Sequence, residues 1–136
     1  MISEIKQAII EKLLTIYPTG YRFYDEDIPQ DLMKPAFVIS AVGQDYRKGL
    51  GNRYNCRLSF ELAYYSGDAA VGIKADCFRK QEELLRAFDD IGSFHVLNRN
   101  ARITDNVLHI GFDIKYTEIR DEAFTPMQQT QVNTNI

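Results

Sequence analysis

The stretch Tyr54–Tyr65, YNCRLSFELAYY, has the most regular alternation of apolar and polar residues in the chain. Its apolar positions are Tyr54, Cys56, Leu58, Phe60, Leu62 and Tyr64, and the positions between them include Asn55, Arg57, Ser59 and Glu61. Successive side chains of a β-strand point to opposite faces, so this stretch predicts a strand with one face buried and one face in water.

Two more strands are predicted on the N-terminal side of this stretch. Residues Ala36–Val42 are almost continuously apolar, which is typical of a strand covered on both faces. The aromatic segment Tyr21–Tyr24 predicts a shorter strand. Between Val42 and Tyr54 lies a polar and glycine-containing segment, Gly43–Arg53, which we interpret as the loop of a hairpin arm.

On the C-terminal side, a β-hairpin is predicted to turn at Asp105-Asn106, a pair that tolerates tight-turn backbone angles. A two-residue turn pairs Ile103, Ala101 and Leu97 with Leu108, Ile110 and Ile114, places His109 opposite Arg102, and places His95 opposite Tyr116. Arg99 would then lie opposite Phe112, on the apolar side. Because a charged residue does not belong there, we expect a bulge or a register change at 98–100.

Two amphipathic helices complete the pattern. The first is predicted over Ile2–Tyr17, with Ser3 as a possible N-cap and Pro18 ending it; its apolar stripe is Ile2, Ile5, Ile9, Leu13 and Ile16. The second is predicted over Ala69–Ile91, with Asp68 as its cap. Its buried stripe is predicted to be Val71, Ala75, Phe78, Leu85, Phe88 and Ile91, widened by Leu84, with Cys77 off the stripe.

These elements predict an α+β fold in a single domain. The order is α-β-β-β-α-β-β, with one mostly antiparallel sheet and two helices packed on it. The chain has 136 residues, a length that suits one domain. We assign residues 1–122 to this domain. Residues 123–136 carry no charged side chain and little periodicity, so we expect a flexible polar tail or an arm that orders against a partner.

The compartment follows from the start of the chain and from the cysteines. Charges are spread through the first twelve residues, and no apolar run approaches the roughly 20 residues of a membrane span, so we expect neither export nor a membrane partner. Cys56 and Cys77 follow no metal or redox spacing. We therefore expect free thiols in a reducing cytoplasm instead of a disulfide.

A search for catalytic chemistry finds weak signals. The polar face of the last strand carries His109, Asp113 and Lys115, but this pattern is equally typical of a solvated or interface-covered sheet face. The acidic run Asp25–Asp27 resembles a surface loop more than a cation site, because it lacks the spacing and glycine of a calcium loop. No nucleotide, nucleophile or zinc motif is present. We expect no catalytic residues, no metal and no cofactor.

The charge is unevenly distributed. The whole chain has a formal net charge of −3. Residues 45–57 hold four basic residues against one acidic residue, a net charge of +3, whereas residues 22–34 hold two against four, a net charge of −2. Opposite patches on one small domain suit head-to-tail packing of identical subunits. A solvated loop, or an arm that makes a few contacts with DNA phosphates, remains an alternative.

Several segments together resemble one family. Gly51-Asn52-Arg53-Tyr54 opens the long alternating strand, Asp105–His109 leads into the last strand, and Pro35–Ile39 forms an apolar strand after the acidic loop. With the amphipathic first helix ending at Tyr17-Pro18, the chain resembles, over nearly its whole length, the small tail terminator (tail completion) proteins of long-tailed phages and prophages. The likeness rests on pattern and order, not on catalytic residues.

This resemblance implies a non-enzymatic structural protein of the virion tail, assembled in the host bacterial cytoplasm. It implies a ring of identical subunits, usually a hexamer, that caps the tail tube, stops its polymerisation and offers a docking surface to the head–neck connector. The expected partners are therefore the chain itself, the tail-tube protein and the connector, with DNA only as passing cargo. The candidate interface residues are Tyr46, Arg47, Lys48, Leu50 and Arg53 on the arm, and Asp25, Glu26 and Asp27 on the opposite patch.

Three alternatives remain at this point. A neck or head–tail connector protein also forms rings of small subunits and needs the same sheet, arm and charged rims. A small enzyme would use His109 and Asp113. A nucleic-acid-binding module would use the basic arm, and its DNA binding would depend steeply on salt.

Overall fold

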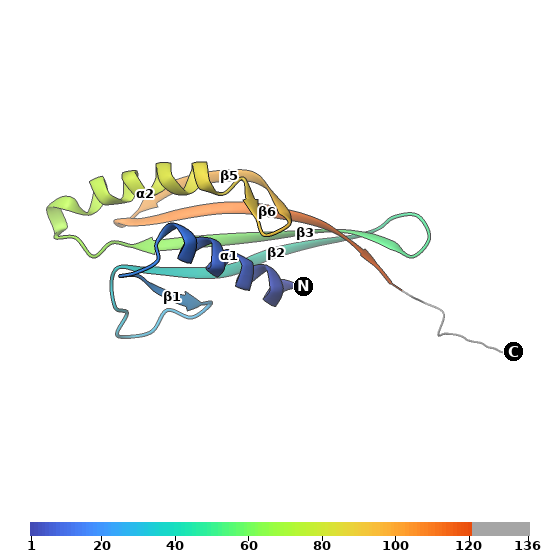
Figure 1. The fold of residues 1–136 in the computed structure, drawn as a ribbon, viewed down its shortest axis with the longest axis horizontal. Coiled ribbons are helices and arrows are strands. Elements are labelled where there is room, and N and C mark those ends of the chain that lie inside the picture. Colours follow the sequence, from blue (N-terminus) through green and yellow to red (C-terminus); the bar gives the residue numbers. More distant parts are fainter. Residues whose placement is uncertain (121–136) are drawn as a thin grey trace, which may run out of the picture.

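The computed structural model describes residues 1–120 as one six-stranded sheet with two helices packed against it (Figure 1). The strand order is β1-β2-β3-β6-β5-β4. In chain order the elements are α1 (Ile2–Ile16), β1 (Arg22–Asp25), β2 (Ala36–Lys48), β3 (Arg53–Tyr65), the 3-10 turn η1 (Ala70–Gly72), α2 (Ile73–Ala87), β4 (Asp90–Ile91), β5 (Phe94–Thr104) and β6 (Val107–Ile119). The predicted tail over 123–136, with the domain end at 122, lies outside the described residues.

The predicted α+β class, the single sheet and the element order are confirmed, with the two-residue strand β4 added. One detail differs. Because β1 pairs parallel to β2 while the other strand pairs are antiparallel, the sheet is mixed. The acidic segment between β1 and β2 makes the crossover that this parallel pair requires.

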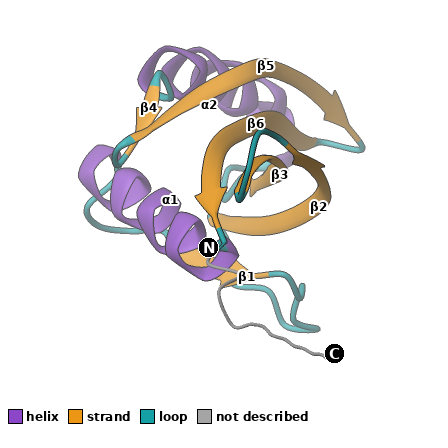
Figure 2. Ribbon diagram, turned by 90° about the vertical axis from the view of Figure 1, so that its right-hand side faces the viewer, coloured by secondary structure: helices purple, strands orange, loops and turns teal. Residues whose placement is uncertain are grey.

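The core lies between the helices and one face of the sheet. Ile5, Ile9 and Leu13 of α1 are fully buried against the apolar face of β3, whose alternating residues Cys56, Leu58, Phe60, Leu62 and Tyr64 are buried as predicted. Both helices therefore cover the same face. Figure 2, seen from the far end of the central strands, shows β2, β3 and β6 curling strongly with the helices outside the curl. None of the described helices is long and apolar enough to cross a membrane.

The C-terminal hairpin agrees closely with the predicted register. It turns at Asp105 and Asn106, which both have positive φ, and pairs Ile103 with Leu108 and Ala101 with Ile110. The register shifts between Leu97 and Asn100, which confirms the expected irregularity around Arg99. This shift makes two pairings wrong: Leu97 lies opposite Asp113, and His95 pairs with Asp90 of β4 instead of Tyr116.

Helix α2 is shorter than predicted. Leu84, Phe88 and Ile91 are buried as predicted, the last two just beyond the helix, but its first turns present a different face to the core. Its buried residues are Asp76, Cys77, Lys80 and Leu84. Val71 and Phe78, which were predicted to be buried, are 95% and 52% exposed, and Cys77 is fully buried. The prediction placed only apolar residues on the buried face of α2. That face also includes Asp76 and Lys80, whose charged groups are bonded within the protein.

The predicted helix caps are also wrong. Helix α1 begins at Ile2, so Ser3 lies in its first turn, and Met1 occupies the N-cap without a side-chain bond. Helix α2 begins after η1, with Gly72 at its N-cap. The Asp68 backbone N–H instead donates a hydrogen bond to Ser66 Oγ, just after the end of β3, at 3.1 Å. Both cysteines are buried and unpaired, as expected of free thiols.

Candidate assembly surface

Three strands continue beyond the helices and form an arm (Figure 1). Strand β2 does not end at Val42 as predicted. It passes over an extra residue between Ala41 and Gly43 and continues to Lys48, so most of the expected loop 43–53 is strand. Along the arm, β2 pairs with β3 and β3 pairs with β6, which places Asp45, Arg57 and Lys115 in one row and Arg47, Asn55 and Thr117 in the next.

The arm ends in a tight turn over residues 49–52. Gly51 has a φ of +63°, a conformation that glycine adopts without the steric cost of a Cβ. The turn is closed by the Gly49 N–H, which donates to the Arg53 carbonyl at 2.7 Å. Leu50 stands at the tip with 91% of its surface exposed. An apolar side chain this exposed on the most distant turn is suited to contact with another molecule.

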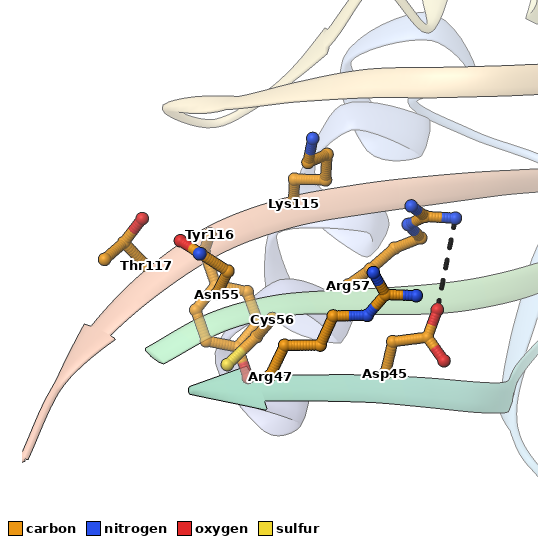
Figure 3. A pocket seen from close by; sticks show the side chains of 8 residues that line it. All are labelled: Asp45, Arg47, Asn55, Cys56, Arg57, Lys115, Tyr116 and Thr117. Atoms are coloured by element: carbon orange, nitrogen blue, oxygen red, sulfur yellow. Dashed lines mark ion pairs between the residues drawn. The ribbon is translucent and has the colours of Figure 1, made fainter. Parts of the chain in front are cut away.

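One face of the arm is polar and hollowed. A depression of about 470 Å³ is lined by Asp45, Arg47, Asn55, Cys56, Arg57, Lys115, Tyr116 and Thr117 (Figure 3). Its lining includes three cations, Arg47, Arg57 and Lys115, and a single carboxylate. That carboxylate, Asp45, lies 4.0 Å from Arg57 Nη1, so the depression keeps an excess of positive charge.

The opposite face of the arm is held together by aromatic residues. The ring of Tyr46 stacks on that of Tyr54 with centroids 5.1 Å apart, and the Arg120 guanidinium lies 4.9 Å from the Tyr54 ring. The Tyr46 hydroxyl donates to Glu118 Oε1 at 2.5 Å, and this hydrogen bond raises the pKa of Tyr46. Burial, followed by contact with Cys56, raises the pKa of Tyr116 to about 12.

The predicted arm residues therefore have different environments. Arg47 lies on the polar face and Lys48 on the aromatic face, because neighbouring residues of a strand point to opposite sides. Leu50 occupies the tip, and Arg53 begins β3. Tyr46 is exposed at one edge but already bonded within the chain.

The predicted acidic patch is partly neutralised from within the chain. Lys6 Nζ lies 2.8 Å from Asp25 Oδ1 and 2.5 Å from Glu26 Oε2. Glu26 also accepts the Ala41 N–H at 2.9 Å. The hydrogen bond from Lys6, followed by that from Ala41, lowers the pKa of Glu26. Asp27 is exposed and its carboxylate makes no ion pair or hydrogen bond among residues 1–120, so it is the carboxylate of the three that is best placed to meet another molecule.

A comparison with protein families matches residues 4–126 to the family described as "Phage tail terminator protein". This match spans the helices, the whole described sheet and the arm. The chain belongs to the phage tail terminator family. Its role is therefore structural, in the completion of a phage tail, and it is a component of the virion tail. A comparison with curated proteins finds no match.

In this terminator-family chain, the pair His109 and Asp113 is not arranged as a joint site. His109 Nδ1 lies 2.9 Å from Glu61 Oε2, while Asp113 accepts hydrogen bonds from Ser59 Oγ and Asn98 Nδ2 at 2.7 and 2.8 Å. Each side chain is thus engaged with a different neighbour on the open face of the sheet.

Sequence reasoning missed a buried polar cluster at the end of β3 that lies away from the arm. Asp76 accepts hydrogen bonds from the hydroxyls of Tyr64 and Ser66 at 2.5 and 2.6 Å, and Lys80 Nζ lies 3.2 Å from it. The Lys80 ammonium is also surrounded by the rings of Tyr17, Tyr21 and Tyr64, each with its centroid between 5.3 and 5.5 Å away. The signal was the i, i+4 spacing of Asp76 and Lys80, which is equally typical of a solvated helix face.

Proposed function

We propose that this chain forms a hexameric ring that caps the tail tube and stops its polymerisation. In this proposal the ring assembles in the host cytoplasm, its far side offers the docking surface for the head–neck connector, and DNA passes through its centre. The work is stoichiometric and has no catalytic turnover. The family match supports the tail role.

The observation that carries the proposal is the three-stranded arm. It extends past the helices, presents an excess of positive charge in the depression and exposes Leu50 at its tip. A projecting arm of this kind packs little against the core of its own chain, so its side chains can contact a neighbouring subunit. The acidic loop near Asp27 lies on another part of the same chain, which suits a head-to-tail contact that closes into a ring.

Charge reversal on the arm tests ring formation. We expect Arg47→Glu combined with Lys48→Glu to abolish rings, because the arm then repels the acidic loop of its neighbour. The control is Lys74→Glu combined with Arg86→Glu, which changes the net charge equally at exposed positions around α2. Mass photometry and negative-stain imaging measure the rings. Rings that persist in the arm variant and match those of the control would rule out the arm as the contact.

Capping is tested with the tail-tube protein of the same phage. We expect the purified chain to bind tube ends and to halt elongation at stoichiometric amounts, with a length distribution that shortens as the chain is added. Parallel binding assays with portal and adaptor proteins separate this role from that of a neck connector. If the chain bound portal or adaptor protein and had no effect on tube growth, the proposed capping role would be wrong and a neck-connector role would be favoured.

A further inference from the structure

The arm has two strand edges without a neighbour. Strand β1 pairs with β2 only along Ala36–Ile39, and β5 pairs with β6 only as far as Ile114. Within residues 1–120, no strand therefore flanks Gln44–Lys48 on one side of the arm or Lys115–Ile119 on the other. An unpaired edge of this length is a template for pairing with another chain.

The hydrogen bonds within the arm show which backbone groups face outward. On β2, the Gly49 N–H donates to β3, and in an antiparallel pair every second residue is bonded to its partner strand in this way. The backbone N–H and C=O groups of the residues between them, Gln44, Tyr46 and Lys48, therefore point away from β3. On β6, the Arg120 N–H donates to the Asn52 carbonyl at the start of β3. The outward groups there are those of Lys115, Thr117 and Ile119.

We propose that these two edges pair with each other between copies, so that β2 of one arm adds to β6 of the next. This inference rests on the proposed ring and adds a contact between neighbouring arms to the contact of the arm with the acidic loop. A heterologous contact uses two different surfaces of each subunit, and the arm has two different edges. Within one chain β2 and β6 run in the same direction, because each is antiparallel to β3. Arms aligned around a ring axis therefore meet as parallel strands.

The charges on the edges select one register. With Asp45 beside Lys115 and Lys48 beside Glu118, both charged pairs have opposite signs, and Tyr46 lies beside Tyr116. A shift of two residues keeps the faces but is unfavourable in either direction: one shift places Arg47 beside Lys115, and the other places Lys48 beside Arg120. Opposite charges on neighbouring strands stabilise a sheet and like charges destabilise it, so the first register is favoured.

Disulfide trapping tests the pairing. In the double variant Arg47→Cys with Thr117→Cys, both thiols lie on the polar face. Within one chain β3 separates them, so two strand spacings, roughly 10 Å in all, keep them too far apart for a disulfide. Between chains they become neighbours in the favoured register. Mild oxidation is expected to give a ladder of covalent multimers on a non-reducing gel, ending at the size of the ring.

Three controls accompany this variant. Each single cysteine variant is expected to give at most dimers, because it offers one thiol per chain. Arg47→Cys combined with Glu82→Cys, which places the second thiol on the exposed side of α2, is expected to give no ladder. The native cysteines are buried in all variants. Rings seen by imaging without a ladder would overturn the edge pairing and leave the ring intact. Absence of rings at every concentration, with tube protein present, would overturn both.

A proline provides a second, independent measurement. Thr117→Pro removes one outward N–H while leaving the hydrogen bonds between β3 and β6 in place, and proline is accepted at such edge positions. We expect the urea midpoint of the monomer to change little and ring formation to be lost. A Thr117→Ser variant retains the N–H and is expected to form rings. Rings from both variants at equal protein concentration would contradict the pairing.

Discussion

At the scale of single residues, the most unusual feature is a carboxylate buried among hydroxyls and cations. Asp76 is 4% exposed, yet it accepts hydrogen bonds from Tyr64 and Ser66 and lies close to Lys80 and Arg79. Burial alone disfavours its charged form, but these donors outweigh that effect and lower the pKa of Asp76. The cluster joins the end of β3 to α2, so it fixes the helix on the sheet through polar contacts.

Removal of this carboxylate is expected to destabilise the fold strongly. Asp76→Ala leaves the buried Lys80 ammonium without its counter-charge, and breaking such a pair costs about 3–5 kcal/mol. Urea unfolding followed by circular dichroism measures the free energy of unfolding. Glu82→Ala, on the exposed side of the same helix, is the control. A loss of under about 1 kcal/mol for Asp76→Ala would show that the cluster contributes little.

The same cluster is expected to limit stability in alkali. Burial, followed by the hydrogen bond to Asp76, raises the pKa of Tyr64. Because the fold favours the neutral phenol, its contribution is complete below the unfolded pKa of about 10 and is lost as the pH rises further. We expect Tyr64→Phe to flatten the decline in unfolding free energy above about pH 10. Tyr65→Phe is the control, and equal slopes in the two variants would contradict this account.

At the scale of elements, helix α2 shows how a sequence pattern misleads. Its apolar residues predicted that Val71 and Phe78 face the core, but Cys77 does so, together with Asp76 and Lys80 and the correctly predicted Leu84. An amphipathic pattern counts buried polar residues as exposed. The two hydroxyls that donate to Asp76 lie at the end of β3 and just after it, twelve and ten residues away along the chain, and no local pattern shows them.

Paired substitutions on α2 test this orientation. Leu84→Ala is expected to cost about 2–5 kcal/mol, because it opens a cavity in the core, whereas Phe78→Ser is expected to cost under about 1 kcal/mol. The free energy of unfolding in urea measures both. If Phe78→Ser were the more damaging change, the burial of Phe78 that the sequence predicted would be correct.

The strands were predicted better than the helix faces. The alternation of Tyr54–Tyr65 and the turn at Asp105-Asn106 depend on neighbouring residues, so the sequence alone contains them. The misplaced charge of Arg99 indicated the register shift, and its Nη1 donates hydrogen bonds to the Leu85 carbonyl of α2 and to Asp89. On the candidate surface, the basic arm was predicted. Its length and the pairing of Lys6 with the acidic patch were not, because both depend on distant contacts.

At the scale of the whole molecule, one end of the described chain holds the groups that stabilise the fold, and the other end holds the surface proposed to contact other subunits. The helices, the core cluster and the buried polar cluster occupy one end, and the core cluster on β3 begins at Leu58. The arm occupies the other end and is not covered by either helix (Figure 1). This division predicts that folding and assembly can be separated by mutation.

Shortening the arm tests the separation. Replacing residues 46–56 by Asn-Gly joins Asp45 to Arg57, a hydrogen-bonded pair, through a two-residue turn of the type that hairpins favour. We expect this variant to fold cooperatively in urea and to form no rings by mass photometry. A variant with Leu50→Ser alone retains the arm and serves as the folding control. Loss of cooperative unfolding in the shortened chain would show that the arm is part of the core.

The alternation of the two faces along the arm has an evolutionary consequence. Ala41 pairs with Phe60 and Gly43 pairs with Ser59, so Val42 has no partner on β3, and its loss would leave the register and both faces of the arm unchanged. Loss of one residue within the regular part of the arm strand, Gly43–Lys48, would instead disturb the alternation of the two faces, whereas the matched insertion of two residues in each strand would keep the faces and lengthen the arm. We therefore expect descent with variation to lengthen or shorten this arm in pairs of residues, so that an arm can be matched to a new partner without a change in its chemistry.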